Sequence, residues 1–167
     1  MFRTFTAIDA RYMRLGLAWG KIVRTVSGID PTFVCADERS YAFLGRNGFP
    51  VLARIPAEAM SSDKRSRHPR STFPSDSAAY TASLKMASAI EFLEAGESIL
   101  YSDVDAIWLR DPIDELTKFD ADLVFQPGIF PADARKRWGF AICTGFFYLR
   151  SSALALTIAR KVRDRFD

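Results

Sequence analysis

The stretch SILYSDVDAIWLRDP, residues 98–112, decides how this sequence is interpreted. It opens with the continuous apolar run Ile99-Leu100-Tyr101, which is typical of a strand buried on both faces of a sheet. The run passes through Ser102 into the acidic segment 103–105 (Asp-Val-Asp). Ligands of open α/β sheets bind outside the carboxyl ends of the strands, so we look for function at this point of the chain.

The two carboxylates of this segment, Asp103 and Asp105, are candidate metal ligands. If the chain is still extended there, both point to the same side, about 6.6 Å apart along the strand. Carboxylate oxygens suit Mg²⁺ or Mn²⁺, which commonly take one or two carboxylates together with substrate phosphates. A second Asp-x-Asp, at 120–122, precedes a strand and is interpreted as a solvated turn.

Apolar runs and helical patterns alternate on both sides of this stretch, which predicts an α/β fold with a mostly parallel sheet. Serine at 151 or 152 is a good N-cap for a last helix that runs to the C-terminus. Asp111 and Pro112 favour the start of a short helix, as N-cap and first residue. The candidate strands are 3–8, 32–36, 50–54, 98–102, 121–125 and 141–149, and the other candidate helices are 11–26, 38–47 and 77–94.

The candidate helix 11–26 is amphipathic, and we expect it to pack on the sheet because it directly follows a strand. The alternative is that its basic face lies on a membrane surface. Its predicted apolar face contains Tyr12, Leu15, Trp19, Ile22, Val23 and Val26.

Composition limits the possible functions. With 167 residues, 26% of them charged, the sequence predicts one domain over 1–167 with a flexible loop at 57–76. Two distant cysteines, Cys35 and Cys143, and a single histidine, His68, argue against a disulfide framework and a His-rich metal site. No nucleic-acid, dinucleotide or P-loop motif is present. Without a membrane span or signal peptide we expect a cytoplasmic protein.

Three segments resemble one enzyme family. YSDVDAIWLRDP (101–112), CTGFFYLRSS (143–152) and, more weakly, TFTAIDARYM (4–13) are similar to the nucleotide-diphospho-sugar transferases of the GT-A fold. The resemblance implies a Rossmann-like domain with a mostly parallel central sheet flanked by helices. It also implies a glycosyltransferase that moves a sugar from a nucleotide-diphospho-sugar, a UDP-sugar, to an acceptor hydroxyl with the help of Mn²⁺ or Mg²⁺.

The same resemblance assigns site residues but no catalytic one. It implies that Asp105 ligates the metal directly and that Asp103 also faces the ribose. A uracil and ribose pocket, a basic contact to donor oxygens and a donor-sugar contact are implied as well. The implied donor-binding residues are Thr6, Ala7, Asp9, Tyr12, Lys85, Asp103, Val104, Thr144 and Gly145, and the implied metal ligands are Asp103 and Asp105.

Some of these residues have simpler explanations. Tyr12 could be a core aromatic of its helix, Lys85 a surface lysine, and Gly145 the mark of a bulge in a strand. Members of the family usually supply a further metal ligand after the TGF strand, whereas this sequence ends at Asp167. We therefore expect a truncated or minimal member of the family.

Two other functions remain open. An apolar strand followed by Asp-x-Asp also begins phosphatases of the haloacid dehalogenase type, in which the first aspartate becomes a phosphorylated nucleophile. That pattern has Thr or Val two residues after the second aspartate, where this sequence has Ile107. The other alternative is a non-catalytic module that binds nucleotides or carbohydrates.

Overall fold

The computed structural model describes residues 2–56, 76–129 and 132–164. Helices and strands alternate along the chain, as the sequence predicts. The strands found in these residues are β1 (Phe2–Ile8), β2 (Thr32–Cys35), β3 (Val51–Ala53), β4 (Ser98–Ser102), β5 (Leu123–Gly128) and β6 (Ala141–Leu149). The helices are α1 (Met13–Ser27), α2 (Glu38–Arg46), α3 (Asp76–Glu94), α4 (Ile113–Leu116), α5 (Ala132–Trp138) and α6 (Ala153–Arg163).

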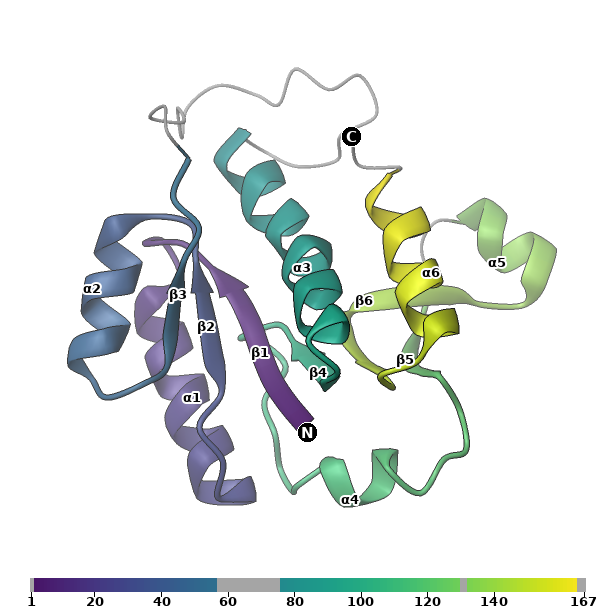
Figure 1. The fold of residues 1–167 in the computed structure, drawn as a ribbon, viewed down its shortest axis with the longest axis horizontal. Helices are drawn as coiled ribbons and strands as arrows, with labels where there is room; N and C mark the ends of the chain where they lie inside the picture. The colour runs from purple at the N-terminus through teal and green to yellow at the C-terminus, as the bar shows by residue number, and fades with distance from the viewer. Residues whose placement is uncertain (1, 57–75, 130–131, 165–167) are drawn as a thin grey trace.

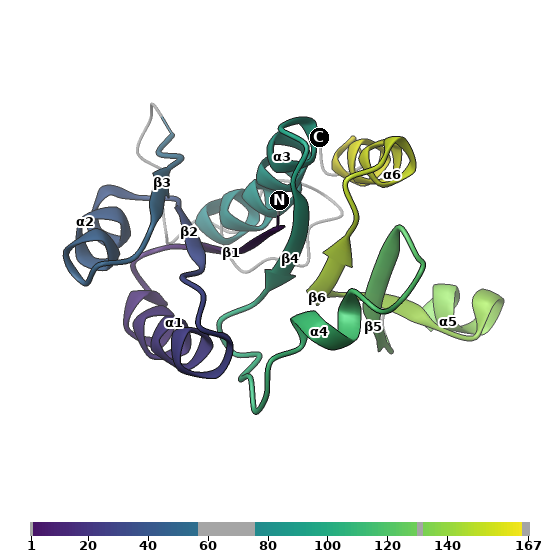
Figure 2. The same ribbon diagram turned by 60° about the horizontal axis from the view of Figure 1, so that its bottom comes forward.

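The described strands form one sheet in the order β3-β2-β1-β4-β6-β5 (Figure 1). Strands β3, β2, β1 and β4 run parallel, whereas β6 is antiparallel to both β4 and β5. Figure 2 shows α3 and α6 on one side of the sheet and α1 and α4 on the other. The expected α/β class with a mostly parallel sheet is confirmed.

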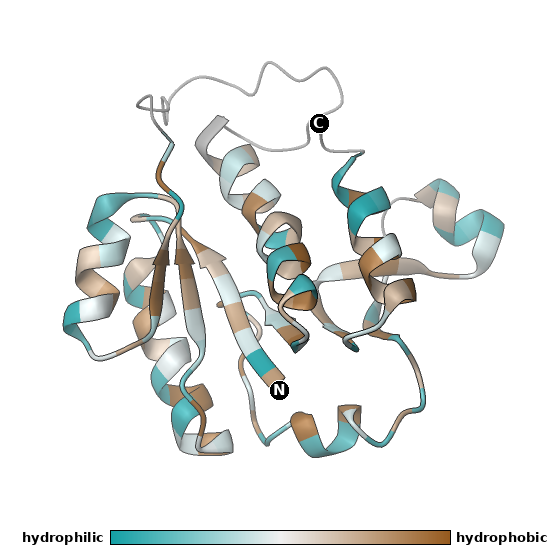
Figure 3. Ribbon diagram, in the orientation of Figure 1, coloured by the Kyte–Doolittle hydropathy of each residue, from teal (hydrophilic) through white to brown (hydrophobic). Residues whose placement is uncertain are grey.

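Each face of the sheet has its own hydrophobic core. On the α3 side, the ring of Phe5 packs edge-on against Phe92 and Tyr101, at centroid distances of 5.1 and 5.2 Å. On the α1 side, Trp19 packs edge-on against Phe33 at 5.7 Å. Strands β2 and β3 are largely hydrophobic in Figure 3, as expected for strands with helices on both faces. Both cores therefore fix the central strands that carry the residues described below.

Helix α1 packs on the sheet, as predicted, but only part of its predicted face is in contact: Trp19 and Val23 are completely buried. Tyr12 and Leu15 are exposed, while Gly16 and Gly20 are buried beside Trp19. A methyl group on Gly16 would lie 2.3 Å from Ile8 Cδ1, so the absence of a side chain lets the helix approach β1 closely. The prediction followed large apolar residues and therefore missed the glycines that make the contact.

Three further elements test the sequence analysis. Ser152 caps α6, since its side chain accepts a hydrogen bond from the Ala155 amide at 3.1 Å. Helix α4 begins at Ile113, one residue later than expected, and the Ile113 amide donates to Asp111 Oδ1 at 2.9 Å. Helix α5 was not predicted, because none of its residues is buried and it has no apolar face to detect.

One expectation, the loop 57–76, falls almost wholly outside the described residues, whereas those on the cysteines and on a membrane span can be compared with the structure. The predicted loop 57–76 lies there except for its last residue, where α3 begins. Both cysteines are free, and burial raises the pKa of Cys35 to about 12. In the described part of the chain, no helix combines the length and apolar character that a bilayer span requires.

Candidate functional site

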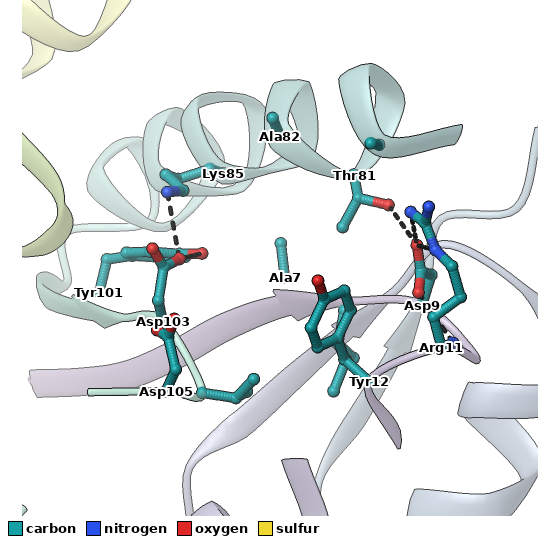
Figure 4. Close-up of a pocket in the computed structure, with 13 residues that line it drawn as sticks. Ala7, Asp9, Arg11, Tyr12, Thr81, Ala82, Lys85, Tyr101, Asp103 and Asp105 are labelled. Atoms are coloured by element: carbon teal, nitrogen blue, oxygen red, sulfur yellow. Dashed lines mark hydrogen bonds and ion pairs between the residues drawn. The ribbon is translucent and has the colours of Figure 1, made fainter. Parts of the chain in front are cut away.

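A cavity of about 330 Å³ lies where the chain direction around the sheet reverses, between the carboxyl ends of β1 and β4. From β1 the chain continues into α1 on one face, whereas β4 is reached from α3 on the opposite face (Figure 2). This is the switch point at which open α/β sheets bind their ligands. The cavity is lined by Ala7, Ile8, Asp9, Arg11, Tyr12, Ala78, Thr81, Ala82, Lys85, Tyr101, Asp103, Val104 and Asp105 (Figure 4).

The acidic segment 103–105 forms a turn at one end of this cavity. Strand β4 ends at Ser102, and the Ala106 amide donates to the Asp103 carbonyl at 3.1 Å. The chain is therefore not extended here, and the expected 6.6 Å spacing along a strand does not apply. Instead, the turn carries both carboxylates to the same end of the cavity (Figure 4). Asp105 is exposed, and no described residue forms a hydrogen bond or ion pair with its carboxylate.

Lys85 reaches this turn from helix α3. Its ammonium donates to Asp103 Oδ1 at 3.2 Å and to the Thr144 carbonyl at 2.9 Å, and it lies 4.3 Å from the centre of the Tyr101 ring. The side chain is only 13% exposed, so the alternative of a surface lysine is wrong. Burial lowers the pKa of Lys85, and the Asp103 carboxylate counters part of that shift.

Tyr101 is a residue of this end that the sequence analysis treated only as part of an apolar strand. It is buried, and its hydroxyl donates to Asp103 Oδ1 at 2.5 Å. Burial and the neighbouring Asp103 raise the pKa of Tyr101 well above its usual value, so the phenol stays protonated and remains a donor. The same carboxylate oxygen therefore accepts hydrogen bonds from both Tyr101 and Lys85.

Two tryptophan side chains form hydrogen bonds on either side of the acidic turn 103–105. The Trp19 indole donates to the Ala106 carbonyl at 3.2 Å, and the Trp108 indole donates to Ser102 Oγ at 3.3 Å. Their rings meet edge-on with centroids 6.3 Å apart. Because one indole bonds the backbone after the turn and the other bonds the Ser102 hydroxyl before it, rigid aromatic groups support the turn that carries the two carboxylates.

The other end of the cavity contains Asp9, which is buried directly after β1. Its carboxylate accepts from the Arg11 amide at 2.9 Å and from Arg11 Nε at 3.0 Å, and Thr81 Oγ1 lies 3.5 Å away. Tyr12 stands between the two ends with 54% of its surface exposed, so the alternative of a core aromatic is wrong (Figure 4). The neighbouring Ala10 amide donates to Asp37, which also caps α2.

Three implied donor-binding residues do not line the cavity. Thr6 is completely buried within β1. Thr144 contributes its backbone carbonyl to Lys85, and the Gly145 carbonyl accepts from the Asp103 amide at 2.7 Å. Both lie in β6 where its pairing with β5 is irregular, so the bulge expected as the simpler explanation for Gly145 is present.

Gly145 also allows a close approach. A methyl group at this position would lie 2.8 Å from Asp103 Oδ2, closer than side-chain carbons come to other atoms. The glycine is therefore needed for the present position of the Asp103 carboxylate. Arg11, Thr81 and Tyr101 line the cavity although the sequence analysis assigned them no role, because a helix pattern and an apolar strand accounted for them.

The carboxylate end fits a divalent cation. Asp103 and Asp105 are hard oxygen ligands on one turn, and no described side chain forms a hydrogen bond or ion pair with Asp105. Among the residues that the structure describes, no three His, Cys, Asp or Glu side chains gather as a ligand set. Mg²⁺ and Mn²⁺ need no such set when substrate phosphates complete their coordination, so two carboxylates are compatible with them.

Comparison with known proteins identifies the family. The family model of the nucleotide-diphospho-sugar transferases matches residues 30–166. The chain belongs to this family. The match includes α3, the acidic turn and β6 but begins after β1, so Asp9 and Tyr12 lie outside it.

A solved structure has a similar fold. The apo-form glycosyltransferase GlyE of Streptococcus pneumoniae TIGR4 is similar to this chain with a TM-score of 0.52 and 17% identity, over 99% of this chain. The chain spans 38% of the length of that glycosyltransferase. No curated protein matches the sequence. At this identity the likeness supports the fold, and the chemistry has to be argued from the cavity.

Proposed function

We propose that the cavity binds a UDP-sugar together with Mn²⁺ or Mg²⁺, and that the protein transfers the sugar to an acceptor hydroxyl. The observation that carries this proposal is the division of one cavity into two chemically different ends (Figure 4). One end has two carboxylates beside a buried ammonium, and the other has a buried carboxylate beside an exposed tyrosine. A nucleoside diphosphate has the matching halves, an anionic diphosphate and an aromatic base that donates a hydrogen bond.

The individual residues have distinct roles in this proposal. Asp103 and Asp105 would hold the cation, which when bound neutralises charge on the departing diphosphate. The Lys85 ammonium donates to a diphosphate oxygen, and Tyr101 keeps Asp103 in place through its hydroxyl. At the other end, Asp9 accepts a hydrogen bond from the base or ribose, and the Tyr12 ring covers that part of the ligand. No residue is proposed as a general base.

The size of the cavity is compatible with this ligand. Small-molecule sites have volumes of about 300–1,000 Å³, and a cavity of about 330 Å³ is at the lower end of that range. The cavity can therefore enclose the nucleotide part of the donor, and the sugar would lie toward Thr144 and Gly145 in the middle of β6. The acceptor would approach from that side.

Thermal unfolding tests the proposal with Mn²⁺ and UDP added separately and together. Ligand at about a hundred times its dissociation constant should stabilise the protein by about 2.7 kcal/mol. We expect the full shift only with both ligands, and we expect Asp105→Asn to lose it while unfolding normally without ligand. Asp120→Asn is the matched control, because Asp120 belongs to the second Asp-x-Asp and its side chain is fully exposed. A wild-type shift that survives in Asp105→Asn contradicts the assignment.

A nucleotide-binding module without turnover is the second candidate. It is favoured by the fact that the described residues supply no third metal ligand beside the two aspartates. Release of UDP from a set of UDP-sugars, with water as acceptor, separates the two functions once binding has been shown. The phosphatase alternative is not retained, because the chain belongs to the transferase family.

A further inference from the structure

The two aspartates of the acidic turn differ in how their charges are compensated. Asp103 Oδ1 accepts hydrogen bonds from Lys85 and Tyr101, so this carboxylate already has a positive partner. Asp105 is exposed and forms no hydrogen bond or ion pair with a described residue, and Lys85 acts on it only at longer range. A divalent cation that binds both carboxylates would thus meet one that is available and one that is already paired.

We infer that Lys85 is an exchangeable counter-charge, which pairs with Asp103 in the free protein and transfers to the donor diphosphate when a divalent cation binds. The inference rests on the proposed function and explains how cation and nucleotide binding would depend on each other. Lys85 lines the cavity on the same side as both aspartates, so all three partners are within one site (Figure 4).

The contacts of Lys85 suit such an exchange. Its bond to Asp103 is a single contact of 3.2 Å to one oxygen, without the second parallel bond that an arginine would make. Its other contacts, the Thr144 carbonyl and the Tyr101 ring, are uncharged and can hold the ammonium while the charged partner changes. The ammonium is largely buried, so it needs an anionic partner, and either Asp103 or a diphosphate can supply it.

This arrangement predicts two opposite effects for the same side chain. When the cation binds alone, Lys85 competes with it for Asp103, so removing the lysine tightens cation binding. When the nucleotide binds with the cation, Lys85 contacts the diphosphate, so removing the lysine weakens nucleotide binding. A residue that only supports the fold would lower both affinities together.

The simplest competing explanation is a general field effect, in which any positive charge at the cavity repels the cation. Arg11 allows this to be tested, because it lines the same cavity but contacts Asp9 at the opposite end. Lys85→Met and Arg11→Met each remove one positive charge and keep an unbranched side chain. Only Lys85→Met removes the competitor for Asp103.

Isothermal titration of Mn²⁺ alone, and of UDP at saturating Mn²⁺, tests the inference on the wild type and both variants. We expect Lys85→Met to tighten binding of Mn²⁺ alone by about fivefold or more, and to weaken UDP binding by at least about fivefold. Arg11→Met should change the affinity for Mn²⁺ alone by less than about twofold, because its charge is screened at the other end. If Lys85→Met does not fold, Lys85→Gln replaces it and keeps a donor for Thr144.

The outcomes separate the inference from the proposed function. Wild-type protein that binds neither Mn²⁺ nor UDP overturns both. Wild-type protein that binds the two ligands together, with a Lys85→Met variant whose affinity for Mn²⁺ alone is unchanged or lower, overturns the exchange only. Equal tightening in Arg11→Met and Lys85→Met also overturns it, because the field of the cavity then accounts for the result.

Discussion

Two ion pairs lie at opposite ends of the central strands, and they are built from similar parts. At the amino end, Arg3 of β1 pairs with Glu97, which directly precedes β4. Arg3 donates to both oxygens of that carboxylate and to Thr32 Oγ1, and it lies 4.7 Å from the centre of the Phe92 ring. This pair is closed, because both carboxylate oxygens are used within the protein.

At the carboxyl end, Lys85 pairs with Asp103, which directly follows β4. Again the cation lies over an aromatic ring, that of Tyr101, at 4.3 Å. Here, however, the cation contacts a single carboxylate oxygen and the pair lines a cavity. The comparison teaches that the number of contacts and the space beside them, more than the residue types, decide whether an ion pair stabilises the fold or is available to a ligand.

The largest expected effect tests the closed pair. Glu97→Gln should lower the free energy of unfolding by about 2 kcal/mol, because it leaves the partly buried Arg3 without its charged partner. Urea unfolding measures this change, and UDP binding at saturating Mn²⁺ should be unaltered. Glu94→Gln is the control, since its pair with Arg160 is about half exposed and should contribute about 0.5 kcal/mol or less. Equal losses of unfolding free energy in the two variants would show that the Arg3–Glu97 pair stabilises the fold no more than an exposed pair does.

A smaller effect is expected when a methyl group is placed against Asp103 of the Lys85–Asp103 pair. Gly145→Ala would place a methyl group 2.8 Å from Asp103 Oδ2, and the end of that side chain can move aside without disturbing the backbone. Stability should therefore change little, whereas UDP affinity at saturating Mn²⁺ should fall about tenfold, or about 1.4 kcal/mol. Gly45→Ala in α2 is the control, because its new methyl group meets only Val51, at 3.4 Å. Unchanged affinity in Gly145→Ala would show that the position of Asp103 is unimportant.

The fold could be predicted where a local signal and the tertiary structure agree. The apolar run before Ser102 and the capping serine at 152 both correspond to observed elements. Helix α5 could not be predicted, because it buries no residue and leaves no periodic pattern. The buried face of α1 was predicted only in part, at Trp19 and Val23, because Gly16 and Gly20 form the rest of that contact and a glycine has no hydrophobicity to detect.

The candidate site was predictable only in part for a related reason. Position along the chain located Asp103 and Asp105 at a strand end, the family resemblance added Asp9, and the structure brings all three to one cavity. Tyr101 was missed because, in the sequence, a strand tyrosine whose hydroxyl bonds a site residue looks the same as one whose ring only packs in the core. The hydrogen bond to Asp103 depends on the turn that follows β4, and a two-residue spacing does not reveal whether the chain turns or stays extended.

The smallest effect concerns the pH dependence of the closed pair. Hydrogen bonds from Arg3 lower the pKa of Glu97 below the ordinary value of 4.5, against the opposing influence of burial. A carboxylate of this kind stabilises the fold above its unfolded pKa, and the stabilisation is lost as the pH falls through the lowered folded value. Glutamine does not titrate, so the difference in unfolding free energy between wild type and Glu97→Gln should be constant from pH 7 to pH 5. Below the ordinary value of 4.5 it should shrink, because the unfolded wild-type chain takes up the proton at Glu97 before the folded protein does. Urea unfolding of both proteins at pH 6 and pH 3.5 measures the change. A difference that stays the same at both values would mean that the packing of Glu97, and not its charge, stabilises the amino end of the sheet.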